Sequence, residues 1–165
     1  MNESLEILYR RHRQGLYSLA ITITGSHQLA EDSVQNAFTK LFSCQLPEGD
    51  RVAYVYKTVR NSAIDIRRTV GRQTRMTESL FNGFRPVAMP SNTPPDDLLT
   101  KERHEQLREA IESLSEDEQE AVILKAFANL TFEQAGQAAR VSAKTLATRY
   151  RRALLKLENQ LNGKL

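Results

Sequence analysis

The chain has 165 residues, a net charge of +3 and a single cysteine, Cys44. This length fits one ordinary domain or two small ones, and one cysteine excludes an internal disulfide. No apolar run approaches a membrane span and the first residues lack a signal peptide's apolar middle, so we expect a cytoplasmic protein.

Charge is unevenly distributed along the sequence. Residues 51–75 hold seven Lys and Arg against one Asp, and residues 140–156 hold six against no acid. Between these two basic segments, residues 94–120 hold ten Asp and Glu against three Lys and Arg. The basic segments indicate acidic partners, and the acidic segment has the opposite charge needed to shield either of them.

Three amphipathic helices are predicted in residues 1–71, because apolar residues recur there at three- and four-residue spacings. The first covers residues 5–23 and stops at Gly25, and Ser26 fits the N-cap of the second. The buried stripe of the second helix is predicted to be Ala30, Val34, Ala37, Phe38, Leu41 and Phe42. The third helix should begin after Asp50, with Val52, Val55, Tyr56, Val59, Ala63, Ile66 and Val70 facing inward.

Residues 72–100 are predicted to form a linker between two domains. Helical spacing disappears there, and the segment is interrupted by Pro86, Pro90, Pro94 and Pro95. Apolar residues between Leu80 and Met89 indicate that the linker docks, either on its own protein or on a partner.

Residues 101–165 are predicted to form a second helical domain. Two capping boxes each start a short helix. Ser115 with Glu118 opens a helix that runs to about residue 128, and Thr131 with Gln134 opens one that runs to about residue 139. A break at residues 140–142 follows, and Ser142 fits the N-cap of the last helix. Helix, three-residue turn and helix in this order are typical of a helix-turn-helix.

The last helix combines a buried stripe with a basic outer face. The predicted stripe is Leu146, Tyr150, Ala153 and Leu157, whereas Lys144, Ala147, Thr148 and Arg151 share the opposite face, flanked by Arg149 and Arg152. Such a helix fits a DNA major groove, since basic side chains neutralise phosphates. Two capped helices with a short turn also occur in plain bundles, so the basic face is what favours DNA binding.

No arrangement of residues typical of an enzyme, metal site or cofactor site is found in the sequence. Its three histidines are scattered and Cys44 has no neighbouring ligand partner. Carboxylates at residues 31–32 and 116–118 lie at predicted helix starts, where they complement the helix dipole. We therefore expect neither catalysis nor a bound cofactor or metal.

Two polar features of the first domain indicate binding. Asp32, Gln35 and Asn36 share a face opposite a buried stripe, and this face could dock a basic helix. Asn61 lies within a basic segment, and an amide offers the paired donor and acceptor that reading a base requires. The commoner role of a single Asn is a cap or a local bond to the backbone.

As a whole, the chain resembles the extracytoplasmic-function class of bacterial RNA polymerase sigma factors. LYRRHRQGLYSLAITITGSHQLAEDSVQNAFTKLF resembles the first two helices of that family, and VAYVYKTVRNSAIDIRR resembles its promoter-melting helices. LREAIESLSEDEQEAVILKAFANLTFEQAGQAARVSAKTLATRYRRALLKL resembles its C-terminal helix-turn-helix domain. The resemblance covers nearly everything except the linker. It implies an all-α fold of two small helical domains, residues 1–71 and 101–165, joined by an extended linker.

The resemblance also implies a role for matching residues. Asp32 and Gln35, with Asn36 beside them, would dock on core RNA polymerase. Asn61 would lie by the pocket for a flipped −10 base of promoter DNA, while Lys57, Arg60, Arg67 and Arg68 would hold the surrounding strand. Lys144, Thr148, Arg149 and Arg152 would lie nearest the −35 element. An anti-sigma protein is the expected regulator, and catalysis would belong to the polymerase.

Three residues depart from the family pattern. Arg140 stands where a glycine is usual in the turn, Ala147 occupies a position that is often basic, and Tyr54 replaces a frequent tryptophan. Two alternatives remain open. One is a helix-turn-helix regulator that binds duplex DNA unaided. The other is a helical adaptor or anti-sigma-binding decoy that has lost promoter function, and Ala147 and Arg140 are the features that favour it.

Overall fold

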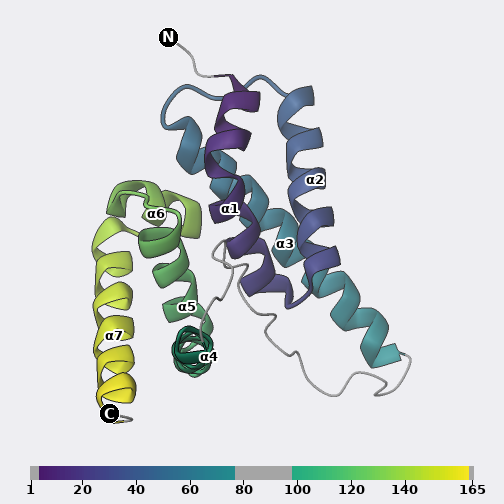
Figure 1. Cartoon of the computed structure of the whole chain (residues 1–165). Helices are drawn as coiled ribbons and strands as arrows, with labels where there is room; N and C mark the ends of the chain where they lie inside the picture. The colour runs from purple at the N-terminus through teal and green to yellow at the C-terminus, as the bar shows by residue number, and fades with distance from the viewer. Residues whose placement is uncertain (1–3, 77–97, 164–165) are drawn as a thin grey trace.

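The computed structural model describes residues 4–76 and 98–163, and all regular structure within these two ranges is helical (Figure 1). The all-α prediction is thereby confirmed. The helices are α1 (Leu5–Thr24), α2 (His27–Ser43), α3 (Arg51–Met76), α4 (Leu98–Glu112), α5 (Glu116–Val122), a π-helix η1 (Ile123–Phe127), α6 (Phe132–Ala139) and α7 (Ala143–Asn162).

The first two helices begin and end where the sequence predicts. Gly25 closes α1 in the left-handed conformation, with φ of 71°, which glycine adopts without steric cost. Ser26 caps α2, because its Oγ accepts a hydrogen bond from the Leu29 backbone N–H at 3.3 Å. Asp50 caps α3 in the same manner through the Ala53 N–H, at 3.0 Å.

Helical structure extends into both ends of the segment predicted as a linker. The third helix continues past Gly71 to Met76, and the fourth already begins at Leu98. Residues 72–76 contain a single apolar residue, Met76, and the adjacent Leu98 and Leu99 are both exposed, so neither extension shows helical hydrophobic periodicity. The predicted docking segment from Leu80 to Met89 lies outside the described residues.

Both predicted capping boxes are present in the C-terminal half. Ser115 with Glu118 opens α5, and Thr131 with Gln134 opens α6. The helix predicted to run to about residue 128 instead changes to the wider π-helix at Ile123, and the Ala128 N–H donates to the Ile123 carbonyl at 2.8 Å. This change occurs where two consecutive side chains, Ile123 and Leu124, are both fully buried.

The two helical halves pack against each other and share one hydrophobic core. Figure 1 shows α5 and α6 on the side of the C-terminal half that faces α1, with α7 on their far side, and α6 contacts α3 while η1 contacts α1. One buried cluster joins residues of both halves, including Leu16, Tyr56 and Val59 from the first and Leu124 and Leu130 from the second. A smaller cluster fills the space among α4, α5 and α7.

The approach between the halves is closest at Gly15 of α1. A Cβ atom at this position would clash with the Tyr56 Oη and lie 3.0 Å from the Ala128 Cβ. Tyr56 is fully buried, its Oη lies 3.2 Å from the His12 Nδ1, and burial raises the pKa of its hydroxyl. Glycine at position 15 therefore lets α1 contact α3 and the second half at one point.

Candidate functional site

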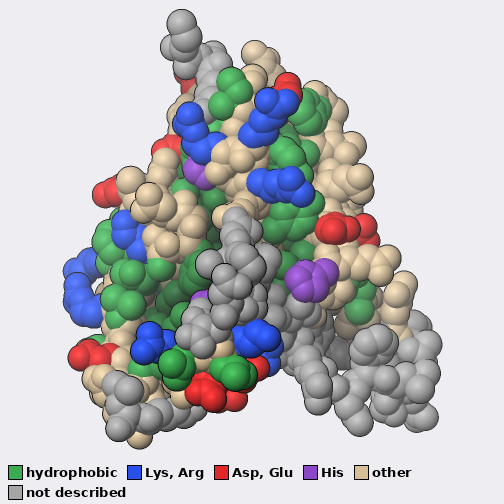
Figure 2. Space-filling view, viewed as in Figure 1, with side chains coloured by type: hydrophobic (Ala, Val, Ile, Leu, Met, Phe, Trp, Pro, Cys, Tyr) green, Lys and Arg blue, Asp and Glu red, His purple; other side chains and the backbone are tan. Residues whose placement is uncertain are grey.

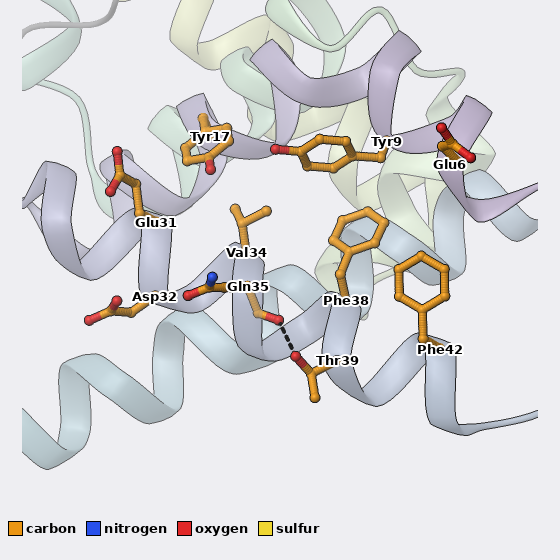
Figure 3. Close-up of a pocket in the computed structure, with 10 residues that line it drawn as sticks. All are labelled: Glu6, Tyr9, Tyr17, Glu31, Asp32, Val34, Gln35, Phe38, Thr39 and Phe42. Atoms are coloured by element: carbon orange, nitrogen blue, oxygen red, sulfur yellow. Dashed lines mark hydrogen bonds between the residues drawn. The ribbon is translucent and has the colours of Figure 1, made fainter.

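A groove of about 450 Å³ lies between α1 and α2 (Figure 3). Its floor is aromatic: the Tyr9 and Phe38 rings meet edge to face with centroids 5.0 Å apart. Acidic and amide groups flank this floor, and the lining residues are Glu6, Tyr9, Tyr17, Glu31, Asp32, Val34, Gln35, Phe38, Thr39 and Phe42. The groove thus offers an apolar floor with negatively charged edges, which suits a basic amphipathic helix.

Two of the three residues predicted to dock on the polymerase line this groove. Asp32 and Gln35 are exposed at its edge, whereas Asn36 is exposed on the same helix but does not line the groove. The Thr39 hydroxyl donates to the Gln35 carbonyl at 2.9 Å, a bond within α2 (Figure 3). Burial, followed by a hydrogen bond with Tyr9, raises the pKa of Tyr17 to about 12, so this phenol stays protonated at neutral pH.

One sequence prediction in the groove is wrong. Phe42 was expected in the buried stripe of α2, yet 67% of its surface is exposed, while Phe38 is 7% exposed. Leu41 in the same turn is 2% exposed, whereas Phe42 lies at the edge of the apolar stripe, about 40° beyond Phe38 around the helix, so spacing alone gave no signal that Phe42 is uncovered. Tyr9 and Tyr17 were missed as groove residues because they come from α1, and only tertiary packing brings them beside α2.

The residues predicted to hold the −10 strand divide into two faces of α3. At about 100° per residue, positions 57, 61 and 68 fall within about 40° of one another, whereas positions 60 and 67 point about a quarter-turn away. Lys57, Asn61 and Arg68 lie on the side away from the buried residues of α3, and within the described residues none of the three side chains has a partner. The amide of Asn61 thus makes no hydrogen bond to another described residue.

The other face of α3 is turned toward the C-terminal half. The Arg60 guanidinium pairs with the carboxylate of Glu120, and both side chains are largely buried. Arg67 pairs with Glu116 through two contacts of 3.3 and 3.5 Å, in a more exposed position. Two of the five predicted −10 residues are therefore already occupied by acids of α5.

The helix-turn-helix of α6 and α7 is confirmed, with residues 140–142 as its turn. Arg140 adopts the left-handed conformation, with φ of 62° and ψ of 36°, as expected for a residue that stands at a glycine position. Ser142 caps α7 by accepting from the Thr145 N–H at 3.1 Å. Gly136 was not singled out from the sequence, yet a Cβ there would lie 2.8 Å from the Val141 carbonyl oxygen. The tight turn therefore requires glycine inside α6.

The four residues predicted for −35 contact lie together at the N-terminal half of α7. Together with residues at the start of α5, they line a hollow of about 480 Å³. The residues that line this hollow are Ser115, Asp117, Glu118, Lys144, Thr145, Thr148, Arg149 and Arg152. Arg149 pairs with Asp117 at 3.6 Å, while Lys144 and Arg152 are exposed. On the face shown in Figure 2, basic side chains are visible on both the N-terminal and the C-terminal helices.

The acidic side chains of α5 have unequal environments. A hydrogen bond from Lys156 at 2.8 Å is the largest cause of a lowered pKa at Glu118, whose carboxylate also belongs to the capping box. Burial raises the pKa of Glu120, and the neighbouring Arg60 opposes this shift. This acidic cluster was expected to complement the helix dipole. In the structure its side chains also pair with basic side chains of α3 and α7.

Neither a metal-binding cluster nor a membrane span emerges from the described ranges. Within residues 4–76 and 98–163 no group of three or more His, Cys, Asp or Glu side chains is placed to hold a metal ion. In the same ranges, none of the helices has the length and apolar character required to cross a membrane.

Comparison with known proteins identifies the family. Residues 8–73 match the sequence model of sigma-70 region 2, and residues 104–157 match that of sigma-70 region 4. No match is found among curated proteins.

Two solved structures have the same fold. One is the sigma factor RpoE of Bartonella quintana, solved with the anti-sigma factor NepR: it is 23% identical, with a TM-score of 0.67 over 89% of each chain. The other is CnrH in complex with the cytosolic domain of CnrY, which is 17% identical with a TM-score of 0.65 over 96% of this chain and 87% of that one. The two matched regions cover most of the chain in the order that the sequence resemblance implied, and the chain belongs to the sigma-70 family as a sigma factor of the extracytoplasmic-function type.

Proposed function

We propose that this protein binds core RNA polymerase, directs it to promoters with particular −35 and −10 elements, and helps to open the −10 region. The observation that carries this proposal is that one chain presents two separate basic helix faces, one on α3 and one on α7. A duplex reader needs one such face, whereas a protein that engages two promoter elements needs both. Catalysis would belong to the polymerase.

The groove between α1 and α2 is the proposed docking site for core polymerase. Asp32 and Gln35 supply polar contacts at its edge, and Asn36 extends the same polar side of α2. The exposed ring of Phe42 supplies apolar surface for a partner helix. An aromatic anchor surrounded by polar groups is the usual composition of a strong protein–protein contact.

Promoter contact is proposed at both basic faces. On α3, Asn61 would read a flipped base while Lys57 and Arg68 hold the backbone, and Arg60 and Arg67 would join them once released from α5. On α7, Lys144, Thr148, Arg149 and Arg152 would enter the major groove of the −35 element. The proposed domains are residues 1–71 and 101–165, with residues 72–100 as the linker.

An anti-sigma protein is the proposed regulator. One of the two structurally similar proteins, RpoE, was solved with the anti-sigma factor NepR, and the other, CnrH, with the cytosolic domain of CnrY. These partners belong to those proteins, and the support they lend here is the shared fold.

The deciding experiment is capture of purified core polymerase by this protein, followed by abortive transcription from a promoter library with the recovered complex. We expect stoichiometric binding and initiation that depends on this protein at a shared −35/−10 pair. Failure to bind core while the protein alone selects duplex DNA would identify an unaided helix-turn-helix regulator. Binding to core without any initiation would identify an adaptor.

A charge reversal tests the docking site within the same assay. Asp32→Arg should weaken core binding, because it reverses a charge at the groove edge. Glu48→Arg is the matched control, since Glu48 is also exposed in the same domain but lies outside the groove. Equal binding by both variants would exclude the groove as the polymerase contact.

A further inference from the structure

Arg140, in the turn of the helix-turn-helix, holds a backbone conformation that does not suit its residue type. Among the described residues, two residues other than glycine have a positive φ, Asn129 at 55° and Arg140 at 62°. Asparagine is enriched in this left-handed region, whereas the Cβ of other residue types is strained there. Arg140 is therefore the residue whose conformation needs an explanation.

The turn imposes this conformation through backbone hydrogen bonds. The Arg140 N–H donates to the Gln137 carbonyl at 3.3 Å, and the Val141 N–H donates to the Gly136 carbonyl at 2.9 Å. This pair of bonds closes a helix in the Schellman motif, where the residue after the last helical one is left-handed and is most often glycine. The turn would thus form with glycine at position 140, and the fold itself does not require arginine.

The side chain of Arg140 makes no contact that offsets this strain. It is exposed, and the part of the chain that the structure describes offers it neither a hydrogen bond nor an ion pair. Other basic residues of this half are paired: Arg149 contacts Asp117 at 3.6 Å. A strained residue with an unpaired charge points to a role in function rather than in stability.

Arg140 lies at the end of α7 that is proposed to enter the major groove. Ser142, Lys144 and Thr145 follow it closely and are all exposed. The N-terminal residues of a recognition helix contact base edges, so the turn before them lies near the phosphates that border the groove. A guanidinium is always charged and its fork of N–H donors fits two phosphate oxygens.

The charges around this end of α7 favour a phosphate. The first turn of the helix contains no acidic residue, so a phosphate meets no opposing carboxylate from it. Lys144 is the one basic residue of that turn, and Ala147 after it is uncharged. Arg140 therefore adds a second unpaired positive charge where α7 begins.

We infer that Arg140 is a contact to DNA phosphate, placed by the turn beside the −35 element, and that it strengthens DNA binding without reading base sequence. The inference rests on the proposed function, because it takes α7 to be the helix that enters the −35 major groove. It adds a DNA contact that lies outside this helix. It also accounts for arginine at a left-handed position, since the side chain lowers the stability of the fold but raises the affinity for duplex DNA.

The inference is tested by titrating the full chain, alone and in complex with core polymerase, onto a fluorescein-labelled duplex of mixed sequence. Anisotropy gives the dissociation constant over a range of salt concentrations, and one phosphate contact contributes about 0.9 to the slope of log Kd against log salt. Arg140→Gln removes the charge and keeps a long side chain, whereas Arg140→Lys keeps the charge. The matched control is Arg103→Gln, the same loss of net charge at an exposed residue of α4 that has no partner among the described residues.

We expect Arg140→Gln to weaken duplex binding by about threefold to tenfold and to lower the salt slope by about 0.9. Arg140→Lys and Arg103→Gln should stay within about twofold of wild type. Arg140→Gly should lose as much affinity as Arg140→Gln, yet its melting temperature should rise by about 2–4 °C, because glycine adopts the left-handed conformation without strain. A variant that is more stable but binds DNA more weakly separates the phosphate contact from any folding defect.

An unchanged salt slope in Arg140→Gln overturns the inference, as does an equal loss of affinity in Arg103→Gln. A lower melting temperature in Arg140→Gly would refute the strain on which it depends. Absence of salt-dependent duplex binding by wild type, both alone and with core polymerase, would overturn it as well. Failure of wild type to capture core polymerase, with the loss in Arg140→Gln intact on duplex DNA, would instead refute the proposed function and leave the phosphate contact standing.

Discussion

Removal of the exposed ring of Phe42 provides the sharpest test of the groove between α1 and α2. A phenylalanine side chain buries about 150–250 Å² when it is fully covered, and two-thirds of Phe42 is exposed, so about 130 Å² is left for a partner. At about 25 cal/mol per Å², covering this area contributes up to about 3 kcal/mol to binding. Phe42→Ala should therefore weaken binding to core polymerase by about tenfold to a hundredfold.

The fold should tolerate this change, because the Phe42 ring makes few internal contacts. It lies 6.4 Å from the Phe38 ring, centroid to centroid, and faces solvent on its other side. We expect a loss of about 1 kcal/mol or less in the free energy of unfolding, measured by urea titration. Phe38→Ala, in contrast, removes a buried ring and should cost about 3–5 kcal/mol.

Binding is measured by titrating each variant onto immobilised core polymerase and comparing dissociation constants. Ile7→Ala is the control, because Ile7 is 48% exposed on the same domain but does not line the groove. A Phe42→Ala variant that binds within about twofold of wild type would refute the area argument. An equal loss in Ile7→Ala would show that the effect is not specific to the groove.

Three further predictions follow from the helix-turn-helix, the open face of α3 and the charges of α5. Gly136→Ala should lower the free energy of unfolding by about 1–3 kcal/mol and weaken −35 binding, because the added methyl group would lie 2.8 Å from the Val141 carbonyl oxygen. Calorimetry tests the stability and DNA titration tests the binding. An unchanged melting temperature would contradict the prediction. Asn61→Ala should impair open-complex formation, assayed by permanganate footprinting, more than polymerase binding, and equal losses in both would exclude a base-reading role. The pKa of Glu118 is lowered in the folded state, so the charged carboxylate stabilises the fold at neutral pH, and this contribution is lost as pH falls through the usual glutamate range. Glu118→Gln should therefore flatten the acid side of the curve of unfolding free energy against pH, measured by urea titration. An unchanged acid slope would exclude the Glu118–Lys156 contact as a cause of the pH dependence.

Sequence reasoning was most successful where the determining interactions are local. Ser26, Ser115, Thr131 and Ser142 were predicted as caps, and each accepts a backbone N–H three residues ahead. Such bonds depend on the identity of a few neighbouring residues, so they can be predicted without knowledge of the fold. The left-handed conformation of Arg140 was indicated instead by the family resemblance, because this residue stands where a glycine is usual in the turn.

Prediction was weakest where burial depends on what covers a residue. Phe42 continues the apolar spacing of α2 but is exposed, whereas Leu41 in the same turn is buried, because packing covers only one side of that turn. The change from α5 to η1 at Ile123 could not be predicted from spacing, because it accompanies burial of two consecutive side chains in the core that both halves share. Whether a side chain is covered is a property of tertiary packing and not of periodicity.

By itself, the sequence determined the helical class, most helix boundaries, the helix-turn-helix and the sigma-factor family, because periodicity, caps and motif order are written in consecutive residues. Only the tertiary structure decided which face each basic residue presents to solvent. Arg60 and Glu120 lie 60 positions apart, and nothing in either neighbourhood specifies the other as its partner. Their contact forms because apolar surfaces on α1, α3, η1 and α6 are buried together, and this packing places the acids of α5 against the arginines of α3.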